Sequence, residues 1–427
     1  MRKVKTFGLW LLVFGALLAL AAGCARQGGQ QAAKEIVIGF NGPLSGPAAE
    51  YGRDCANGVE MAINEINEAG GITVGGQKYV FRLEKLDHRA DPSQAVANAR
   101  RFRDQFKARV VFDCVFNCIA PQLEINQEKG NEFLMMAWTS TPKMVELGNK
   151  FVVAIPPPFT AYMKAFMDMA WQEGYRKVAM VVTTGAYGDE WRSIFKQEWQ
   201  KRGGVITADQ PANYYAQTDF SAQLTAALAT KPDALLIGGP SSTTALVIEQ
   251  ARNLGFKGGF ILVDQAKMDY IVDEVFKGKM DQMGTTIGVG AVGQYPTPAA
   301  KSFNEKYQAK YQVHNTWEAA GNYTAMHALA KAMVAAGTVE DVSAIRAAFD
   351  KVFPMSGDKY PTEILGIHKN GQMLMMPLPQ EMKNGKYQDP WLMVYWTRTQ
   401  EGFERVKEKL SVPQMARWVP LEGYYVD

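Results

Sequence analysis

The sequence has few of the residues that enzymes use most often: its 427 residues include four histidines and four cysteines. The histidines are far apart and form no recognisable catalytic pattern: His88, His314, His327 and His368. His327, in a helical pattern, is expected to be a packed or surface residue. The chain also lacks a Gly-x-Ser-x-Gly elbow, a Walker loop and a His-Glu-x-x-His motif. These absences favour a binding protein without a cofactor over an enzyme.

The mature part of the sequence shows no excess of charge of either sign. The chain has 46 Lys and Arg against 43 Asp and Glu, and Arg2, Lys3 and Lys5 belong to an N-terminal signal. Without these three the formal charge is zero, which argues against nucleic acid as a partner, because phosphate binding needs a basic field. No later run approaches 18 apolar residues, so nothing further is expected to span a membrane.

Residues 1–23 have the features of a secretory signal: a basic start, an apolar run and small residues before Cys24. Residues 20–24, Leu-Ala-Ala-Gly-Cys, resemble the bacterial lipobox, in which the cysteine is lipidated and becomes the mature N-terminus. A transmembrane anchor is the alternative, but the apolar run is short for a span. Residues 24–35 are expected to be a flexible tether. We therefore expect an exported protein, periplasmic or on the cell surface, anchored to the membrane by lipidated Cys24.

Residues 36–71 have the pattern that opens a doubly wound α/β unit. The apolar run 36–40 predicts a buried strand, and the loop after it, with two Gly and two Pro, cannot continue that strand. Apolar residues then recur at helical spacing: Val59, Ala62, Ile63 and Ile66. Gly70 and Gly71 end the helix. Ligands of such folds bind beyond the carboxyl ends of the strands, where this loop lies.

Strands continue to alternate with helices, which predicts parallel sheets with right-handed crossovers. Asp91 and Pro92 mark a helix start, as N-cap and first helical residue. The expected strands are 79–87, 109–115, 133–138, 151–155, 177–183, 205–207, 234–238 and 260–263. The expected helices include 120–129, 161–171, 190–201, 220–229, 243–254, 268–276, 298–311 and 318–336.

The opening unit resembles the first motif of the extracellular solute-binding proteins of the branched-chain amino acid transport type, the leucine/isoleucine/valine-binding family. The matching segments are Gly-Pro-Leu-Ser-Gly-Pro at 42–47, Asn-Gly at 57–58, Ile-Asn-Glu-Ile-Asn at 63–67 and Gly-Gly-Ile at 70–72. The likeness continues more loosely to about residue 375. It implies the type I periplasmic binding protein fold, an α/β chain in two Rossmann-like lobes joined by a three-segment hinge.

The resemblance also divides the chain. We expect lobe 1 at 36–155 and 290–370, and lobe 2 with a C-terminal extension at 156–289 and 371–427. The crossings between the lobes are expected near three segments: 156–158, 285–293 and 369–373. The prolines at 156–158 cannot sit in a central strand and stiffen the first crossing. Residues 389–397 are expected to add a strand to lobe 2.

Polar side chains after the predicted strands offer a ligand site between the lobes. In lobe 1, the hydroxyls of Thr139 and Ser140 can take a carboxylate. In lobe 2, Tyr187 stands in the Tyr-Gly pair typical of the family, and its ring can hold an ammonium group. Asp264 matches the family's acidic partner for the ligand amine, and Ser241 is a further candidate. Helix capping is the alternative interpretation for Thr139, Ser140 and Asp264.

One part of the expected site departs from the family. Where the family carries a turn rich in Ser and Thr, this chain has Phe116 and Asn117. Tyr51 and Trp138 also flank the expected cleft. The pocket is therefore expected to be bulkier and more aromatic than one shaped for leucine.

Three cysteines follow Cys24: Cys55, Cys114 and Cys118. An exported protein permits a disulfide, and Cys55 is expected near the same cleft as the other two. A bridge from Cys55 to Cys114 or Cys118 is one alternative, and three reduced, buried cysteines are the other. A metal site is not expected, because the spacing is not Cys-x-x-Cys and no histidine is near in sequence.

The sequence thus favours a lipid-anchored receptor that feeds an ATP-driven importer of the ABC type. Its lobes close over an amino acid or a related small polar solute, because only the closed form lets both lobes contact it. Membrane permease subunits then recognise the closed form. Two alternatives are a ligand sensor on the same fold and, from another class, a secreted hydrolase that uses Asp264 or a free cysteine.

We predict that Cys24→Ala prevents lipidation and leaves the globular domain folded, because the predicted domain begins only near residue 36. Membrane partitioning after a high-salt wash, with the thermal unfolding midpoint measured in parallel, tests this. A variant that stays with the membrane fraction would place the anchor elsewhere.

Overall fold

The computed structural model describes residues 32–295 and 297–427. The predicted signal 1–23 and the predicted lipidation site Cys24 lie outside the described residues. The predicted tether 24–35 is too long at its end, since Lys34 and Glu35 belong to the first strand. None of the helices in the described ranges combines the length and the apolar character that crossing a bilayer requires.

Lobe 1 is built on a six-stranded sheet in the order β2-β3-β1-β4-β5-β6. The strands from β3 to β6 are parallel, and β2 is antiparallel to β3. Their bounds are Lys34–Gly42 (β1), Ile72–Val74 (β2), Gln77–Asp87 (β3), Val110–Asp113 (β4), Leu134–Ala137 (β5) and Val152–Ala154 (β6). The helices between them are Ala49–Glu68 (α2), Pro92–Asp104 (α3), Phe116–Ile125 (α4) and Lys143–Glu146 (α5). The α3 start is confirmed, because the Asp91 side chain accepts hydrogen bonds from the backbone N–H of Ser93 and Gln94.

Lobe 2 is built on a seven-stranded sheet in the order β15-β14-β11-β10-β9-β7-β8. The strands are Lys177–Val182 (β7), Val205–Asp209 (β8), Ala234–Gly238 (β9), Gly259–Leu262 (β10), Thr286–Val289 (β11), Pro379–Lys383 (β14) and Lys386–Tyr387 (β15). The helices include Phe159–Gln172 (α6), Ala186–Lys201 (α7), Ser221–Leu228 (α8), Ser241–Asn253 (α9) and Met268–Tyr270 (α10). The five strands from β11 to the edge strand β8 are parallel, and β14 runs antiparallel to β11. This alternation confirms the predicted α/β class.

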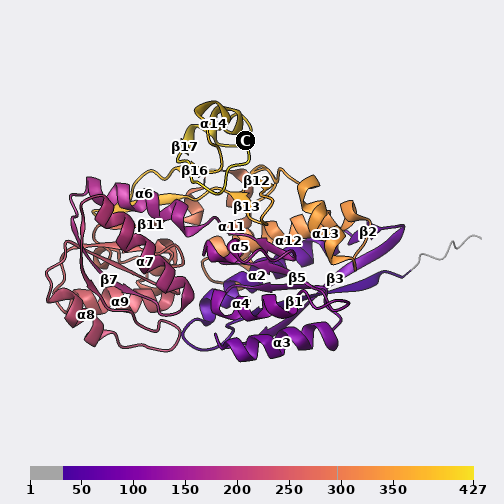
Figure 1. Ribbon diagram of the computed structural model, residues 1–427, viewed down its shortest axis with the longest axis horizontal. Helices are drawn as coiled ribbons and strands as arrows, with labels where there is room; N and C mark the ends of the chain where they lie inside the picture. The colour runs from indigo at the N-terminus through magenta and orange to yellow at the C-terminus, as the bar shows by residue number, and fades with distance from the viewer. Residues whose placement is uncertain (1–31, 296) are drawn as a thin grey trace, which may run out of the picture.

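The two lobes lie side by side (Figure 1), and the chain passes between them three times. After β11 it returns through α11 (Pro298–Tyr311) to α12 (Trp317–Ala336), which packs against α2 of lobe 1 and is followed by α13 (Val342–Ala348). The hairpin of β12 (Ile364–Ile367) and β13 (Met373–Met375) precedes the last passage. There the Gln372 amide donates to the carbonyls of Ala154 and Pro156, so the third passage runs beside the first.

Some predicted elements are wrong, among them α7, which begins at Ala186 and not at residue 190. Helix α4 begins at Phe116, not at residue 120, because the Val115 carbonyl already accepts the N–H of Cys118 and Ile119. Residues 389–397 add no strand to lobe 2. Instead β16 (Leu392–Val394) pairs with β17 (Ala416–Trp418) in a separate sheet, and the lobe 2 sheet ends with β14 and the edge strand β15.

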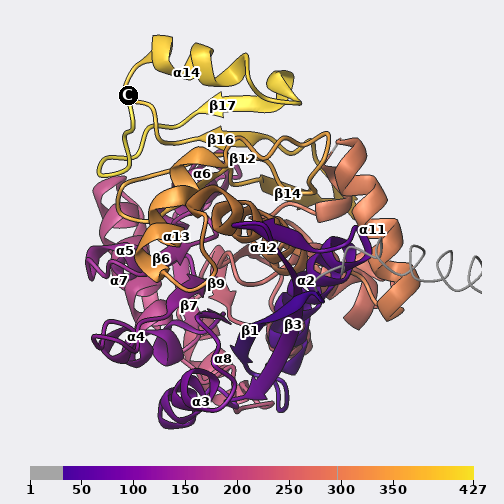
Figure 2. The ribbon, with the colours of Figure 1, turned by 90° about the vertical axis from the view of Figure 1, so that its right-hand side faces the viewer.

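The C-terminal extension, β16, β17 and α14 (Gln400–Lys407), forms a layer along one side of the molecule (Figure 2). Tyr395 and Trp396 are buried under it. The Ser411 hydroxyl donates to Glu363, and Lys164 of α6 donates to the Pro420 carbonyl. The extension therefore contacts the segment before the last passage and lobe 2 together.

The packing of α12 on α2 depends on a residue without a side chain. A Cβ atom at Gly58 would lie 2.1 Å from the Ala319 carbonyl oxygen, so only glycine permits this close approach. The contact matters for function because α2 carries Tyr51 and α12 carries Glu318, both of which reach the inter-lobe cavity.

We predict that Gly58→Val lowers the free energy of unfolding by about 1–3 kcal/mol, because the added side chain forces the two helices apart. Thermal or urea unfolding measures this loss, with exposed Arg53→Ala on the same helix as the control. Equal stability of Gly58→Val and the control would contradict the assigned packing.

Candidate functional site

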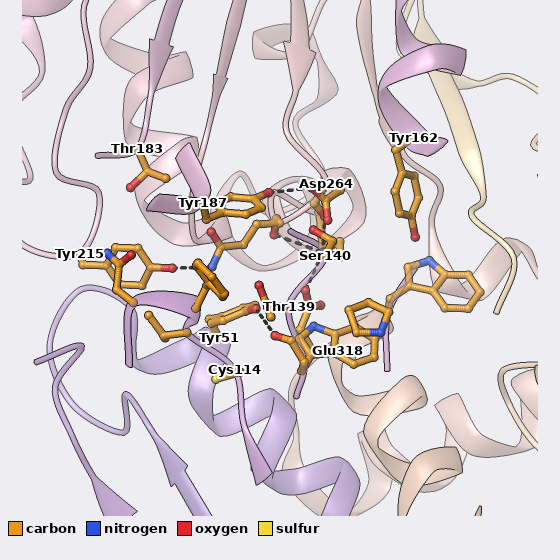
Figure 3. A pocket seen from close by; sticks show the side chains of 18 of the residues that line it. Tyr51, Cys114, Thr139, Ser140, Tyr162, Thr183, Tyr187, Tyr215, Asp264 and Glu318 are labelled. Carbon is orange, nitrogen blue, oxygen red and sulfur yellow. Dashed lines mark hydrogen bonds and ion pairs between the residues drawn. The ribbon is translucent and has the colours of Figure 1, made fainter. Parts of the chain in front are cut away.

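A cavity lies between the lobes, at the carboxyl ends of the central strands (Figure 3). Eight of the nine predicted ligand residues line it: Tyr51, Phe116, Asn117, Trp138, Thr139, Ser140, Tyr187 and Asp264. The ninth, Ser241, is buried beside it, where its hydroxyl accepts the backbone N–H of Lys267. Ser241 thus orients a cavity residue without forming part of the wall.

Asp264 follows β10 and is nearly buried. Its Oδ1 accepts hydrogen bonds from the Tyr187 hydroxyl at 2.6 Å and the Trp191 indole N–H at 2.9 Å. Its Oδ2 has no hydrogen-bond partner in the described part of the chain. Helix α10 begins after Lys267 without a side-chain cap within these residues, so the capping interpretation of Asp264 has no support. The carboxylate therefore keeps one oxygen for a donor inside the cavity.

Tyr187 is held by the groups around it. Burial raises the pKa of its hydroxyl well above the usual value, and the adjacent Asp264 carboxylate raises it further. The ring of Phe159 meets the Tyr187 ring edge-on, with centroids 6.1 Å apart. Tyr187 is thus a neutral donor that fixes the Asp264 carboxylate, in addition to an aromatic wall.

Thr139 and Ser140 follow β5 and face the cavity from lobe 1. The next helix, α5, has no side-chain cap within the described residues, so capping does not account for these hydroxyls. Ser140 is anchored through its backbone, because its carbonyl accepts the N–H of Phe159 at the start of α6. Both hydroxyls are therefore positioned by buried backbone and remain able to bind an acceptor.

A buried ion pair that the sequence did not reveal forms another part of the wall. Lys267 Nζ of lobe 2 lies 2.5 Å from Glu318 Oε1 of α12, and the two side chains are 5% and 2% exposed. The Lys267 ammonium also donates to the carbonyls of Asp264 and Gln265. The second oxygen of Glu318 accepts from the Thr316 hydroxyl. Both charges are thus satisfied inside the protein, across the two lobes.

Two further carboxyls of α2 lie behind this pair. Burial, reinforced by the Glu318 carboxylate, raises the pKa of Asp54 to about 7. Burial also raises the pKa of Glu50 to about 8, although the backbone N–H of Ser242 opposes the shift. Desolvation disfavours the charged form of each group, so both are poised to hold a proton near neutral pH.

Side chains of lobe 1 cap two helices of lobe 2. Asn117 Oδ1 accepts the N–H of Ala186, the first residue of α7, at 2.9 Å. Glu50 Oε1 accepts the N–H of Ser242 in the first turn of α9, also at 2.9 Å. In residues 32–295 and 297–427 neither helix start has a capping side chain from its own lobe. These two bonds therefore exist only while the lobes are together.

Aromatic side chains enclose much of the cavity, as the sequence predicted. Besides the predicted ones, three rings that sequence reasoning missed line the wall: Tyr162, Tyr215 and Trp317. Trp138 packs against α12 at Gly321, where a Cβ atom would lie 2.1 Å from the indole ring. The missed rings lie in a loop and at helix ends far from the strand-end motifs, so periodicity gives no signal for them.

Within the described residues Cys55, Cys114 and Cys118 are unpaired, buried thiols, so of the two alternatives the structure has three reduced cysteines and not a bridge from Cys55. Burial raises the pKa of each thiol, which disfavours the thiolate. Cys118 Sγ lies 3.8 Å from Nδ1 of His88, whose other ring nitrogen contacts Asp113 at 3.3 Å. The side chains of His88 and Asp113 are 0% exposed, so this Cys-His-Asp arrangement is closed to a substrate.

The comparisons with known proteins agree with this architecture. The Leu/Ile/Val-binding protein BraC3 of Rhizobium johnstonii is 28% identical over 339 residues, which cover 77% of this chain and 86% of that protein. A crystal structure of a leucine-binding protein from Thermotoga maritima has a TM-score of 0.68 at 25% identity, over 83% of this chain and 97% of that one.

A branched-chain amino acid transporter substrate-binding protein from Streptococcus pneumoniae, solved with isoleucine, has a TM-score of 0.69 at 20% identity and covers 84% of this chain and 99% of its own. At that identity the likeness shows the fold alone. Residues 35–378 match the model of the periplasmic binding protein family. The chain therefore belongs to the periplasmic binding protein family.

Proposed function

We propose that this protein is the substrate-binding protein of an ABC importer and binds an amino acid or a related small polar solute between its lobes. The observation that carries the proposal is the pairing of Asp264, with one free carboxylate oxygen, and the Thr139 and Ser140 hydroxyls, which face the same cavity from the other lobe. An ammonium group fits the first and a carboxylate the second. The Leu/Ile/Val-binding relative from Rhizobium johnstonii and the leucine-binding protein from Thermotoga maritima support an amino acid as the ligand.

Ligand binding is coupled to closure of the two lobes. A ligand that contacts both lobes stabilises the closed form, because in the open form it can contact only one lobe at a time. In the closed form Asn117 and Glu50 also cap the helices of the opposite lobe. The permease then meets a surface that both lobes form together. Export and a lipid anchor at Cys24 complete the proposal and place the receptor beside its permease.

No catalytic role is part of the proposal. The hydrolase alternative needs a thiolate or an exposed acid-base pair, and burial keeps the cysteines protonated. Incubation with candidate esters and amides should therefore give no turnover above that of an Asp264→Ala variant.

We predict that Asp264→Asn weakens binding of the cognate ligand by about 2–5 kcal/mol, because a buried cation loses its charged partner. A thermal-shift screen of amino acids, amides, small aromatic acids and urea analogues first identifies the ligand, which adds about 2.7 kcal/mol of stability at 100 times its dissociation constant. Calorimetry then compares the variant with exposed Asp281→Asn. Wild-type affinity of Asp264→Asn would show that the ligand places no cation there.

We predict that Glu50→Ala weakens ligand binding by about 0.5–2 kcal/mol without direct contact, because it removes a helix cap that forms only on closure. Glu50→Gln keeps an acceptor oxygen and should bind almost as tightly as wild type. Calorimetry gives the affinities, and small-angle scattering at saturating ligand shows whether compaction is retained. Equal loss in both variants would mean that the charge of Glu50, and not its cap, matters.

A further inference from the structure

We infer that Gln265 and Tyr215 form a subsite for a hydrogen-bond donor on the ligand's side chain, so that the ligand is a polar, uncharged amino acid. The inference rests on the proposed amino acid-binding function and narrows it to a class. It concerns the part of the cavity beyond the groups that face the ammonium and the carboxylate.

Gln265 is placed at the cavity wall by the loop that follows β10, and its side chain is 6% exposed. Its Nε2 donates to the Tyr215 hydroxyl at 2.8 Å. Its Oε1 is buried and has no hydrogen-bond partner within residues 32–295 and 297–427. A buried acceptor without a partner lowers stability, so an acceptor that lines a binding cavity indicates a donor supplied by the ligand.

The subsite lies apart from the ammonium position. Asp264 and Gln265 are consecutive, and their side chains reach different partners, Tyr187 in one case and Tyr215 in the other. Figure 3 shows Asp264 and Tyr215 on opposite sides of the Tyr187 ring. A ligand with one donor at Asp264 therefore has room for a second donor toward Gln265.

The charges that line the wall do not complement a charged side chain at this subsite. Lys267 is the cation of the wall, and its ammonium is shared among Glu318 and two backbone carbonyls. Both oxygens of Glu318 have partners as well, on Lys267 and Thr316. An amide or a hydroxyl on the ligand satisfies Gln265 without bringing an unpaired charge into the cavity.

Aliphatic side chains of the same shape leave Gln265 unpaired. A site that hydrogen-bonds a substrate group discriminates strongly against the analogue that lacks the group, whereas a purely apolar pocket cannot reject an isostere that adds a hydroxyl. Two isosteric pairs isolate this effect: asparagine with leucine, and threonine with valine.

Calorimetry of the purified protein with these four amino acids and aspartate tests the inference. We expect the polar member of at least one pair to bind at least about tenfold more tightly than its aliphatic partner. Asparagine should also exceed aspartate, which brings a negative charge in place of the amide donor. Gln265→Met keeps the length of the side chain but removes the amide, so it should weaken binding of asparagine and threonine. In this variant the affinities within each pair should differ by no more than about threefold.

The outcomes separate the inference from the proposed function. Leucine and valine that bind as tightly as asparagine and threonine would overturn the inference and leave amino acid binding intact. Tighter binding of aspartate than of asparagine would overturn it too, because a carboxylate there has no donor for the Gln265 oxygen. Binding of none of the five would overturn the inference, and failure of a wider amino acid screen would also remove the proposed function. Should Gln265→Met fail to fold by circular dichroism, the wild-type ratios alone decide.

Discussion

The buried ion pair between Lys267 and Glu318 joins the two lobes at the wall of the cavity, 2.5 Å apart. Taking two charges out of water is expensive, and the pair is tolerable because each group has further hydrogen-bond partners. Removing one partner would leave the other charge buried alone, which costs about 3–5 kcal/mol. The closed arrangement therefore depends on this pair being complete.

Polar contacts between the lobes also suit a protein whose lobes must separate. When the cleft opens, water can hydrate the Lys267 ammonium and the Glu318 carboxylate, whereas an apolar interface would resist exposure. The helix caps from Glu50 and Asn117 have the same character, since backbone N–H groups can bond to water instead. Small differences between contacts of similar strength then let a ligand shift the balance toward closure.

The rigid parts of the site come from the sheets and the helices packed on them. Asp264 follows β10 and Thr139 follows β5, so buried parallel strands fix both groups at the same edge of their sheets. Tyr51 and Glu318 depend on α2 and α12, which approach closely at Gly58. Ligand recognition is thus assembled from two lobes that are each rigid and meet mainly through polar contacts.

Local sequence determined the α/β alternation and most strand ends, because burial periodicity is a short-range property. The eight predicted side chains of the cavity wall came from strand-end position together with the family resemblance. Local sequence did not determine that α4 starts at Phe116, which turned Asn117 into a cap for another helix. The cysteine alternatives were also decided by tertiary packing.

The polar contacts between the lobes could not be predicted either, because they join residues that are far apart in the sequence. Glu318 meets Lys267 across 51 residues and Glu50 meets Ser242 across 192, and each of these residues alone looks like an ordinary polar residue near a helix start. The sequence by itself specified most of the helices and strands and the strand ends near which a ligand would bind. Which charges are paired, and which acceptor is left for the ligand, depends on distances between the lobes that only the tertiary structure sets.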